Sequence, residues 1–248
     1  MKRLWIPLCL ILIGSADFPA QSTAQDHSMH QGHQTHASMV DTTIDPPNPM
    51  KRLADKEESE FNHHLAGLFV VLGGLFILTQ RAFTYRWPWT KYIWPSTFLL
   101  SGFFVLVWSD TELWPFGDRR WLEALQNNRE VLQHKTFALL LLALACIEGL
   151  RAKGELNRVW SALVFPVLAI GGSILLLFHQ HEAGMHGPGH METMGRIQSE
   201  HFEYAVMGIG LGIAKALAEL KTRGQPFFAT LWPLLMVGLG VLLMFYRE

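Results

Sequence analysis

Apolar runs of about 17 to 20 residues recur along the chain, separated by polar segments, and each is about long enough to cross the hydrocarbon core of a bilayer as a helix. A helix is suited to that environment because it satisfies its own backbone hydrogen bonds. The pattern predicts an all-α polytopic membrane bundle of six transmembrane helices, at about 62–80, 92–109, 134–150, 159–178, 201–220 and 228–246.

The first apolar run of the chain is shorter and follows the basic residues Lys2 and Arg3. A basic start, a short apolar core and small residues after it are typical of a cleavable signal peptide, which we assign to residues 1–24. Residues 25–60 are polar, rich in His and Met, and predict a disordered tail. The expected organisation is therefore a signal peptide, a tail at 25–60 and a six-helix transmembrane domain at 61–248.

Positive charge is unevenly distributed among the loops. Segments 80–91, 151–158 and 221–226 carry Lys and Arg with almost no acid, whereas segments 110–133 and 179–200 are longer and more acidic. The positive-inside rule places the first three in the cytoplasm. We therefore expect a bacterial inner-membrane protein whose N-terminal tail and two acidic loops are periplasmic. No basic run suggests nucleic acid, and Cys146 is the only cysteine after the signal peptide, which excludes a disulfide framework within the chain.

The histidines all fall on the predicted periplasmic side. His63 and His64 open the first span, His134 the third and His201 the fifth, while His179 ends the fourth. Ionisable groups inside a membrane bundle are costly and indicate function. We predict one shared metal or cofactor site at the outer mouth of the bundle, built from His134, His179, His201 and one of the two adjacent histidines, which differ by about 100° around the helix.

Small residues lie below three of these histidines on the same helical faces: Gly67 and Gly74 below His63, Ala138 below His134, and Gly208 and Gly212 below His201. Small residues mark the surfaces where membrane helices approach one another, so these faces should point toward neighbouring helices. Asp110 and Glu182, at the same membrane face, are candidates to orient a histidine ring.

The tail and the second acidic loop add thioether groups to the imidazoles. Imidazole binds zinc, copper, nickel and iron, whereas thioether favours Cu(I), so the mixture predicts copper. The tail histidines are spaced three residues apart and would collect metal at the membrane surface. The candidate ligands in these two segments are His27, His30, His33, His36, His181, His186, His190, Met185, Met191 and Met194.

The stretches "FNHHLAG", "LQHK" and "FHQHE", with the His/Met-rich segments, resemble the CopD-like copper-resistance membrane proteins, inner-membrane helical bundles that handle periplasmic copper. The resemblance covers residues 60 to 246 and implies copper uptake or resistance. It assigns no functional residue.

The favoured function is therefore that of a non-enzymatic protein that captures periplasmic copper and stores, passes or translocates it, with a periplasmic copper chaperone as a possible partner. A second hypothesis is a membrane cytochrome in which two of the histidines are axial ligands of haem b. A third, a copper or di-iron oxidase, needs carboxylate ligands, but helical spacing turns Glu200 and Glu203 away from His201.

Two acidic residues and one basic residue lie in the inner halves of the predicted spans. Lys215 and Glu219 are four residues apart and should form a local ion pair. Glu148 is a further candidate partner for Lys215.

Overall fold

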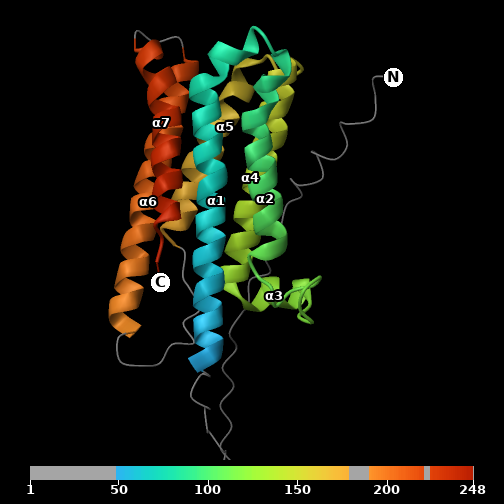
Figure 1. The fold of residues 1–248 in the computed structure, drawn as a ribbon, viewed down its shortest axis with the longest axis vertical. Helices are drawn as coiled ribbons and strands as arrows, with labels where there is room; N and C mark the ends of the chain where they lie inside the picture. The colour runs from blue at the N-terminus through green and yellow to red at the C-terminus, as the bar shows by residue number, and fades with distance from the viewer. Residues whose placement is uncertain (1–48, 179–189, 221–223, 248) are drawn as a thin grey trace, which may run out of the picture. The chain divides into compact units, whose positions relative to one another are not determined.

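The computed structural model describes residues 49–178, 190–220 and 224–247, and these residues form helices and no β-strand. Six long helices run side by side, and the short α3 lies at one end of them (Figure 1). The all-helical fold predicted from the apolar runs is confirmed. In chain order the elements are α1 (Pro49–Thr84), the 3-10 helix η1 (Pro88–Tyr92), α2 (Ile93–Trp108), α3 (Trp121–Asn127), α4 (Arg129–Lys153), α5 (Val159–Leu176), α6 (His190–Glu219) and α7 (Gln225–Met244).

The six long helices pack as a closed ring in the order α1, α2, α4, α5, α6, α7, with α7 returning to α1. In the described part of the chain the backbone of each long helix lies next to those of its two neighbours in this order, and the rings of Trp94, Phe165 and Trp232 meet across the middle. α4 therefore lies across the ring from α7, and the middle of the bundle is bounded by all six helices.

Five segments are long and apolar enough to cross a membrane: Leu53–Gln80, Pro88–Trp108, Arg129–Lys153, Val159–Leu176 and Gln225–Met244. Large apolar side chains such as Leu72, Phe103, Val167 and Leu234 point outward from these segments and are exposed. A belt of exposed apolar side chains around a bundle is what lipid requires, and it fits a membrane protein. α6, which corresponds to the fifth predicted span at 201–220, is not among the five segments, and Glu203 and Lys215 lie within its apolar part.

Two helices begin more than ten residues earlier than the sequence predicts. α1 starts at Pro49, inside the predicted tail, and α6 starts at His190, inside the predicted second acidic loop. Both extensions are polar, and hydropathy detects the part of a helix that suits lipid rather than the whole helix. The predicted signal peptide and the part of the predicted tail up to residue 48 lie outside the described residues.

Helices pack closely at the glycine-containing faces that the sequence predicts to be contact surfaces. A Cβ atom built on Gly67 would lie 2.6 Å from the carbonyl oxygen of Gly240, so α1 and α7 touch through their backbones. A Cβ atom on Gly212 would lie 2.6 Å from Ile170 Cγ1, and Gly208 meets Ser173 in the same way, which brings α6 against α5. The expectation that small residues mark helix contacts is confirmed at these positions.

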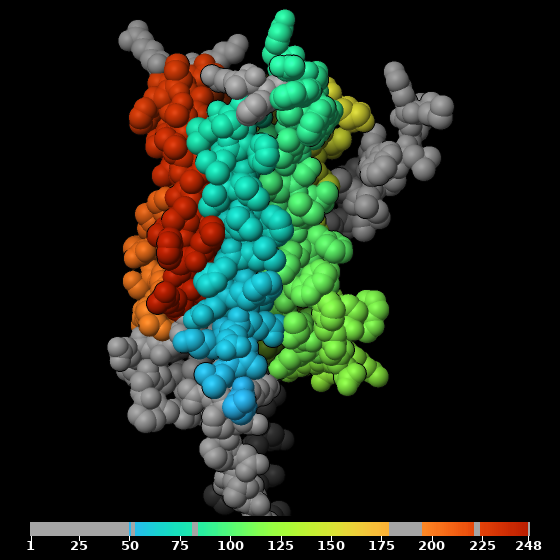
Figure 2. All heavy atoms as spheres, viewed as in Figure 1, coloured from blue at the N-terminus to red at the C-terminus, as the bar shows by residue number. Residues whose placement is uncertain are grey.

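The two ends of the bundle differ in their polar residues. We call the end that holds His63, His134 and His201 the histidine end, and the opposite end, which holds Arg151, the arginine end. At the histidine end, α3 and the loop before it form a lobe beside the first turns of α1 (Figure 2). The lobe is tied to α1 because Thr111 Oγ1 donates a hydrogen bond of 2.9 Å to Glu58 Oε2.

Candidate metal and cofactor site

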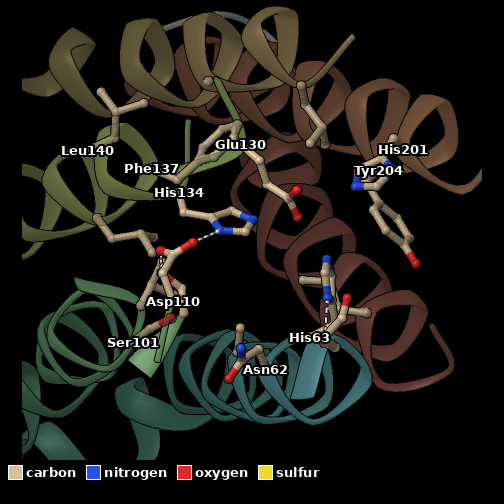
Figure 3. A pocket seen from close by; sticks show the side chains of 18 of the residues that line it. Asn62, His63, Ser101, Asp110, Glu130, His134, Phe137, Leu140, His201 and Tyr204 are labelled. Carbon is tan, nitrogen blue, oxygen red and sulfur yellow. Dashed lines mark hydrogen bonds and ion pairs between the residues drawn. The ribbon is translucent and has the colours of Figure 1, made fainter. Parts of the chain in front are cut away.

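A half-open cavity of about 1640 Å³ lies between the helices and opens at the histidine end, where the first turns of α1 and the loop before α3 complete its walls. Its walls are mostly apolar and include Phe98, Leu144, Phe165 and Met236. Its polar side chains gather at the histidine end, where they come from opposite sides of the ring (Figure 3). The cavity is larger than the roughly 300 to 1,000 Å³ typical of small-molecule sites.

His63 on α1 and His201 on α6 form a pair at this mouth. Their ring centroids are 6.2 Å apart and their planes are inclined by 76°. His63 Nδ1 lies 2.8 Å from the carbonyl oxygen of Ser59, and His201 Nδ1 lies 2.8 Å from that of Ile197. A carbonyl only accepts, so each Nδ1 carries the proton and each neutral ring has its lone pair on Nε2.

Tyr246, just past the end of α7, is the wall behind this pair. Its ring stacks on His63 with centroids 3.9 Å apart, and it meets His201 edge to face at 6.1 Å. It is fully buried. The sequence near the chain end does not predict the contact of Tyr246 with the histidines, because this contact depends on α7 lying between α1 and α6.

The structure separates the adjacent histidines. His63 lines the cavity, whereas His64 Nε2 hydrogen-bonds the carbonyl oxygen of Tyr246 at 2.9 Å. His63 is therefore the member of the pair that faces the site, and His64 ties α1 to the end of α7.

His134 lies across the cavity with its own acidic partner. Its Nδ1 is 3.1 Å from Asp110 Oδ1, so the prediction that Asp110 orients a histidine ring is confirmed. Lys135 Nζ lies 2.8 Å from Asp110 Oδ2 and also donates to the carbonyl of Leu106 at 2.9 Å and to Ser109 Oγ at 3.1 Å. Figure 3 shows the His134 ring pointing into the cavity beside Glu130.

The carboxyl group of Asp110 is held ionised by this arrangement. Burial alone would raise its pKa, but the hydrogen bond and charge of His134 and the charge of Lys135 outweigh burial. The pKa of Asp110 therefore lies far below its ordinary value of 3.8. An ionised Asp110 accepts from His134 Nδ1, which turns the Nε2 side of the ring toward the cavity.

The predicted shared site is only partly assembled. His63, His134 and His201 line one cavity, but no group of three His, Cys, Asp or Glu residues within the described ranges is close enough to hold a metal ion. The reason is the ring order: α1 and α6 flank α7, whereas α4 lies opposite. The expectation of one compact set of histidines is therefore not met by the described residues.

Several predicted ligands fall outside what the structure describes. His190, Met191 and Met194 lie on the first residues of α6, whose side chains are not described, and the remaining ones lie in segments 1–48 and 179–189, also outside the described residues. These are His27, His30, His33, His36, His179, His181, His186 and Met185.

Carboxylates also line the mouth, and the sequence did not single out most of them. Among the described residues, the lining holds five acidic residues and the two cations Lys56 and Arg119, while Lys135, which is not part of the lining, pairs with Asp110. Glu200 and Glu203 are not part of this lining, in agreement with their predicted orientation. The acidic residues are Asp55, Glu58, Asp110, Glu112 and Glu130.

The site combines a histidine pair, a separate carboxylate–histidine dyad and an acidic mouth above a large apolar cavity. Comparison with protein-family models, with curated proteins and with solved structures finds no match to this chain.

Proposed function

We propose that the protein is a membrane copper-binding protein that captures copper on the exported side and holds it with His63 and His201. The observation that carries this proposal is the imidazole pair itself. Rings from two helices lie with centroids 6.2 Å apart, and both Nδ1 atoms bond to backbone carbonyls. Nε2 is then the metal-binding nitrogen of each neutral ring.

Copper fits this pair better than zinc does. Structural zinc sites are almost always closed by four ligands, whereas Cu(I) is stable with fewer ligands, among them imidazole and thioether. The acidic mouth attracts cations, and the His/Met-rich tail would bring metal to it. A periplasmic copper chaperone would be a suitable donor of the metal.

The proposal includes α6 as a sixth span. Phe202, Val206 and Ile213 are exposed and follow one helical face, while His201 and Lys215 are buried on the inner side. That division suits a helix with lipid on one side and the bundle on the other. The basic loops at the arginine end support a periplasmic histidine end, by the positive-inside rule.

The test is copper content and affinity of the detergent-purified full chain. His63→Phe and His201→Phe keep a ring of similar size but remove the ligand nitrogen, and each should abolish the tightest copper site. Gln133→Leu is the control, because Gln133 lies at the same end of the bundle but outside the cavity lining, and it donates a hydrogen bond to the Phe178 carbonyl. Unchanged copper affinity in both His63→Phe and His201→Phe would refute the proposal.

The tail is tested separately. Deletion of residues 25–45 should lower the total number of copper ions bound but leave one tight site in the bundle. A deletion variant that binds no copper would locate the binding in the tail and exclude the histidine pair as an independent site.

A second candidate function is that of a b-type haem cytochrome, and the large cavity beside two histidines favours it. The acidic mouth disfavours it, because haem propionates are anionic. An absorption spectrum of protein expressed with a haem precursor separates the two. A Soret band that shifts on reduction and disappears in His201→Phe would establish the cytochrome instead of the copper protein.

A further inference from the structure

The connection between α1 and α2 exposes several aromatic side chains at the arginine end. It consists of a turn and η1, and it lies at the end of the bundle away from α3 (Figure 1). Thr90 is buried, and its Oγ1 donates a hydrogen bond of 2.7 Å to the carbonyl oxygen of Trp87, which fixes the local shape. The exposed aromatic residues are Tyr85, Trp87, Trp89 and Tyr92. Rings with an apolar body and a polar tip are suited to the interface between lipid and water.

Two cations of this connection lie over aromatic rings. Arg86 Cζ is 5.3 Å from the centroid of the Trp87 ring, and Lys91 Nζ is 5.1 Å from that of Tyr92. Both distances are within the roughly 6 Å at which a cation is attracted to the face of a ring. Neither cation forms an ion pair or donates a hydrogen bond within the part of the chain that the structure describes. Their N–H groups are therefore available to an anion from outside the protein.

The charge around this connection is positive. Residues 85–92 include no acidic residue. η1 packs against α4, and Lys153 at the end of α4 interacts electrostatically with Tyr92 while it pairs with Glu155 at 2.6 Å. The mouth at the histidine end has the opposite sign, since acidic residues outnumber cations in its described lining. The partner expected at the arginine end is therefore anionic.

We propose that this connection binds the head group of an anionic phospholipid. We call its binding residues the basic aromatic surface: Arg86, Trp87, Trp89, Lys91 and Tyr92. Phosphate oxygens accept hydrogen bonds from the Arg86 guanidinium and the Lys91 ammonium group. The exposed rings lie against the glycerol and the first part of the acyl chains.

A lipid fits the basic aromatic surface better than a soluble anion does. A small anion such as free phosphate would use the two cations and leave the rings in water. α1 ends just before this surface and α2 begins just after it, and both belong to segments that are long and apolar enough to cross a membrane. The surface is therefore placed where head groups meet the hydrocarbon. It contains no histidine and does not depend on copper at His63 and His201.

The test is native mass spectrometry of the detergent-purified full chain, titrated with dioleoyl phosphatidylglycerol and separately with dioleoyl phosphatidylcholine. Wild type should bind phosphatidylglycerol more tightly than phosphatidylcholine. One cation near an anionic lipid surface accounts for a roughly fivefold change in affinity, so Arg86→Gln and Lys91→Gln should each weaken phosphatidylglycerol binding by about that factor.

Arg120→Gln is the matched control for the two cation variants. Arg120 is an exposed arginine at the histidine end and forms no ion pair with any described residue. This variant should bind phosphatidylglycerol as wild type does. Equal affinities of wild type for the two lipids, or wild-type phosphatidylglycerol affinity in both Arg86→Gln and Lys91→Gln, would overturn the proposal.

A second pair of variants tests the aromatic part of the surface. Trp89 and Trp114 are both exposed tryptophans, at opposite ends of the bundle. Trp89→Ala should weaken phosphatidylglycerol binding, because the ring no longer covers the acyl chains, and Trp114→Ala should not. Equal phosphatidylglycerol affinities in these two variants would refute the assignment to a lipid.

Competitors separate a lipid from other anions. Inorganic phosphate and polyglutamate, each at the concentration of the lipid, should leave phosphatidylglycerol bound. Displacement by phosphate would show a site for small anions, and displacement by polyglutamate would show a surface for a soluble acidic partner, so either result would refute the proposal. The copper test fails or succeeds independently: His63→Phe should keep phosphatidylglycerol affinity, and Arg86→Gln should keep copper affinity.

Discussion

Charged side chains bond to one another at both ends of the bundle, but at the histidine end several of them also line the large cavity. Arg151 contacts both Glu148 Oε1, at 2.8 Å, and Glu219 Oε2, at 3.0 Å. Lys215 contacts Glu219 Oε1 at 2.5 Å and lies 4.4 Å from the Trp232 ring centroid. Two cations balance two anions there, and aromatic rings cover them. A buried cluster with equal numbers of cations and anions contributes to stability. Acidic side chains that outnumber the cations at the mouth of a cavity are instead suited to binding.

The largest expected effect comes from breaking the cluster at the arginine end. Arg151→Leu leaves Glu148, whose side chain is 3% exposed, without its cation. Removing one partner of a buried pair costs about 3 to 5 kcal/mol, so the free energy of unfolding in an SDS titration should fall by that amount. Copper affinity should not change in the protein that remains folded.

The matched control for this variant is Lys153→Leu. Lys153 pairs with Glu155 in an exposed position at the same end of the bundle, where an ion pair contributes little. The comparison between the two ends would be wrong if Arg151→Leu were as stable as this control, or if it lost copper while remaining folded.

An intermediate effect is expected where the helix contact supports the histidine pair. Gly67→Ala places a methyl group 2.6 Å from the Gly240 carbonyl, so α1 must move away from α7. We expect a loss of about 1 to 3 kcal/mol in the free energy of unfolding. Copper affinity should also fall, because the shift separates His63 from the Tyr246 ring on which it stacks.

Gly149→Ala is the control for the glycine substitution, since a Cβ atom there has nothing within 4 Å. Alanine is favoured over glycine in a helix by up to about 1 kcal/mol, so this variant should be as stable as wild type or slightly more stable. Isothermal copper titration of both variants would show whether the α1–α7 contact affects binding, and equal affinities would contradict that link.

The two ends also differ in how well the sequence predicted them. At the arginine end the local pair of Lys215 and Glu219 was predicted from spacing alone and is confirmed. The suggested contact between Glu148 and Lys215 is not the one the structure shows, because Glu148 receives two hydrogen bonds from Arg151. Pairs four residues apart follow from helix geometry, whereas partners on different helices depend on helix order.

At the histidine end, the sequence predicted which residues share one end of the bundle but not which of them are neighbours. Alternating spans put His63, His134 and His201 at one end, and they line one cavity. The ring order, which brings Tyr246 beside two of them and sets His134 across from both, has no signature in the hydropathy of single spans. The polar extensions of α1 and α6 were missed for a related reason, since they lack an apolar run.

The smallest expected effect on stability depends on pH, and this dependence separates the histidine end from the arginine end. Asp110→Asn removes a carboxylate, but Lys135 keeps its bonds to Leu106 and Ser109, so the loss in unfolding free energy near pH 7 should be about 1 to 2 kcal/mol. The folded pKa of Asp110 is depressed. The stability that the ionised Asp110 carboxylate contributes is therefore fully present above its unfolded pKa, about 3.9. That contribution declines as the pH falls below this value toward the folded pKa.

Thermal unfolding of wild type and Asp110→Asn between pH 7 and pH 3 would measure this contribution. The stability difference between the two proteins should be constant down to about pH 5 and should shrink below about pH 4. The same difference measured for Arg151→Leu should persist between pH 7 and pH 5, because the guanidinium group does not titrate there. A difference for Asp110→Asn that grows as pH falls would mean that the carboxyl group is already protonated in the folded protein, and that it does not hold His134 toward the cavity.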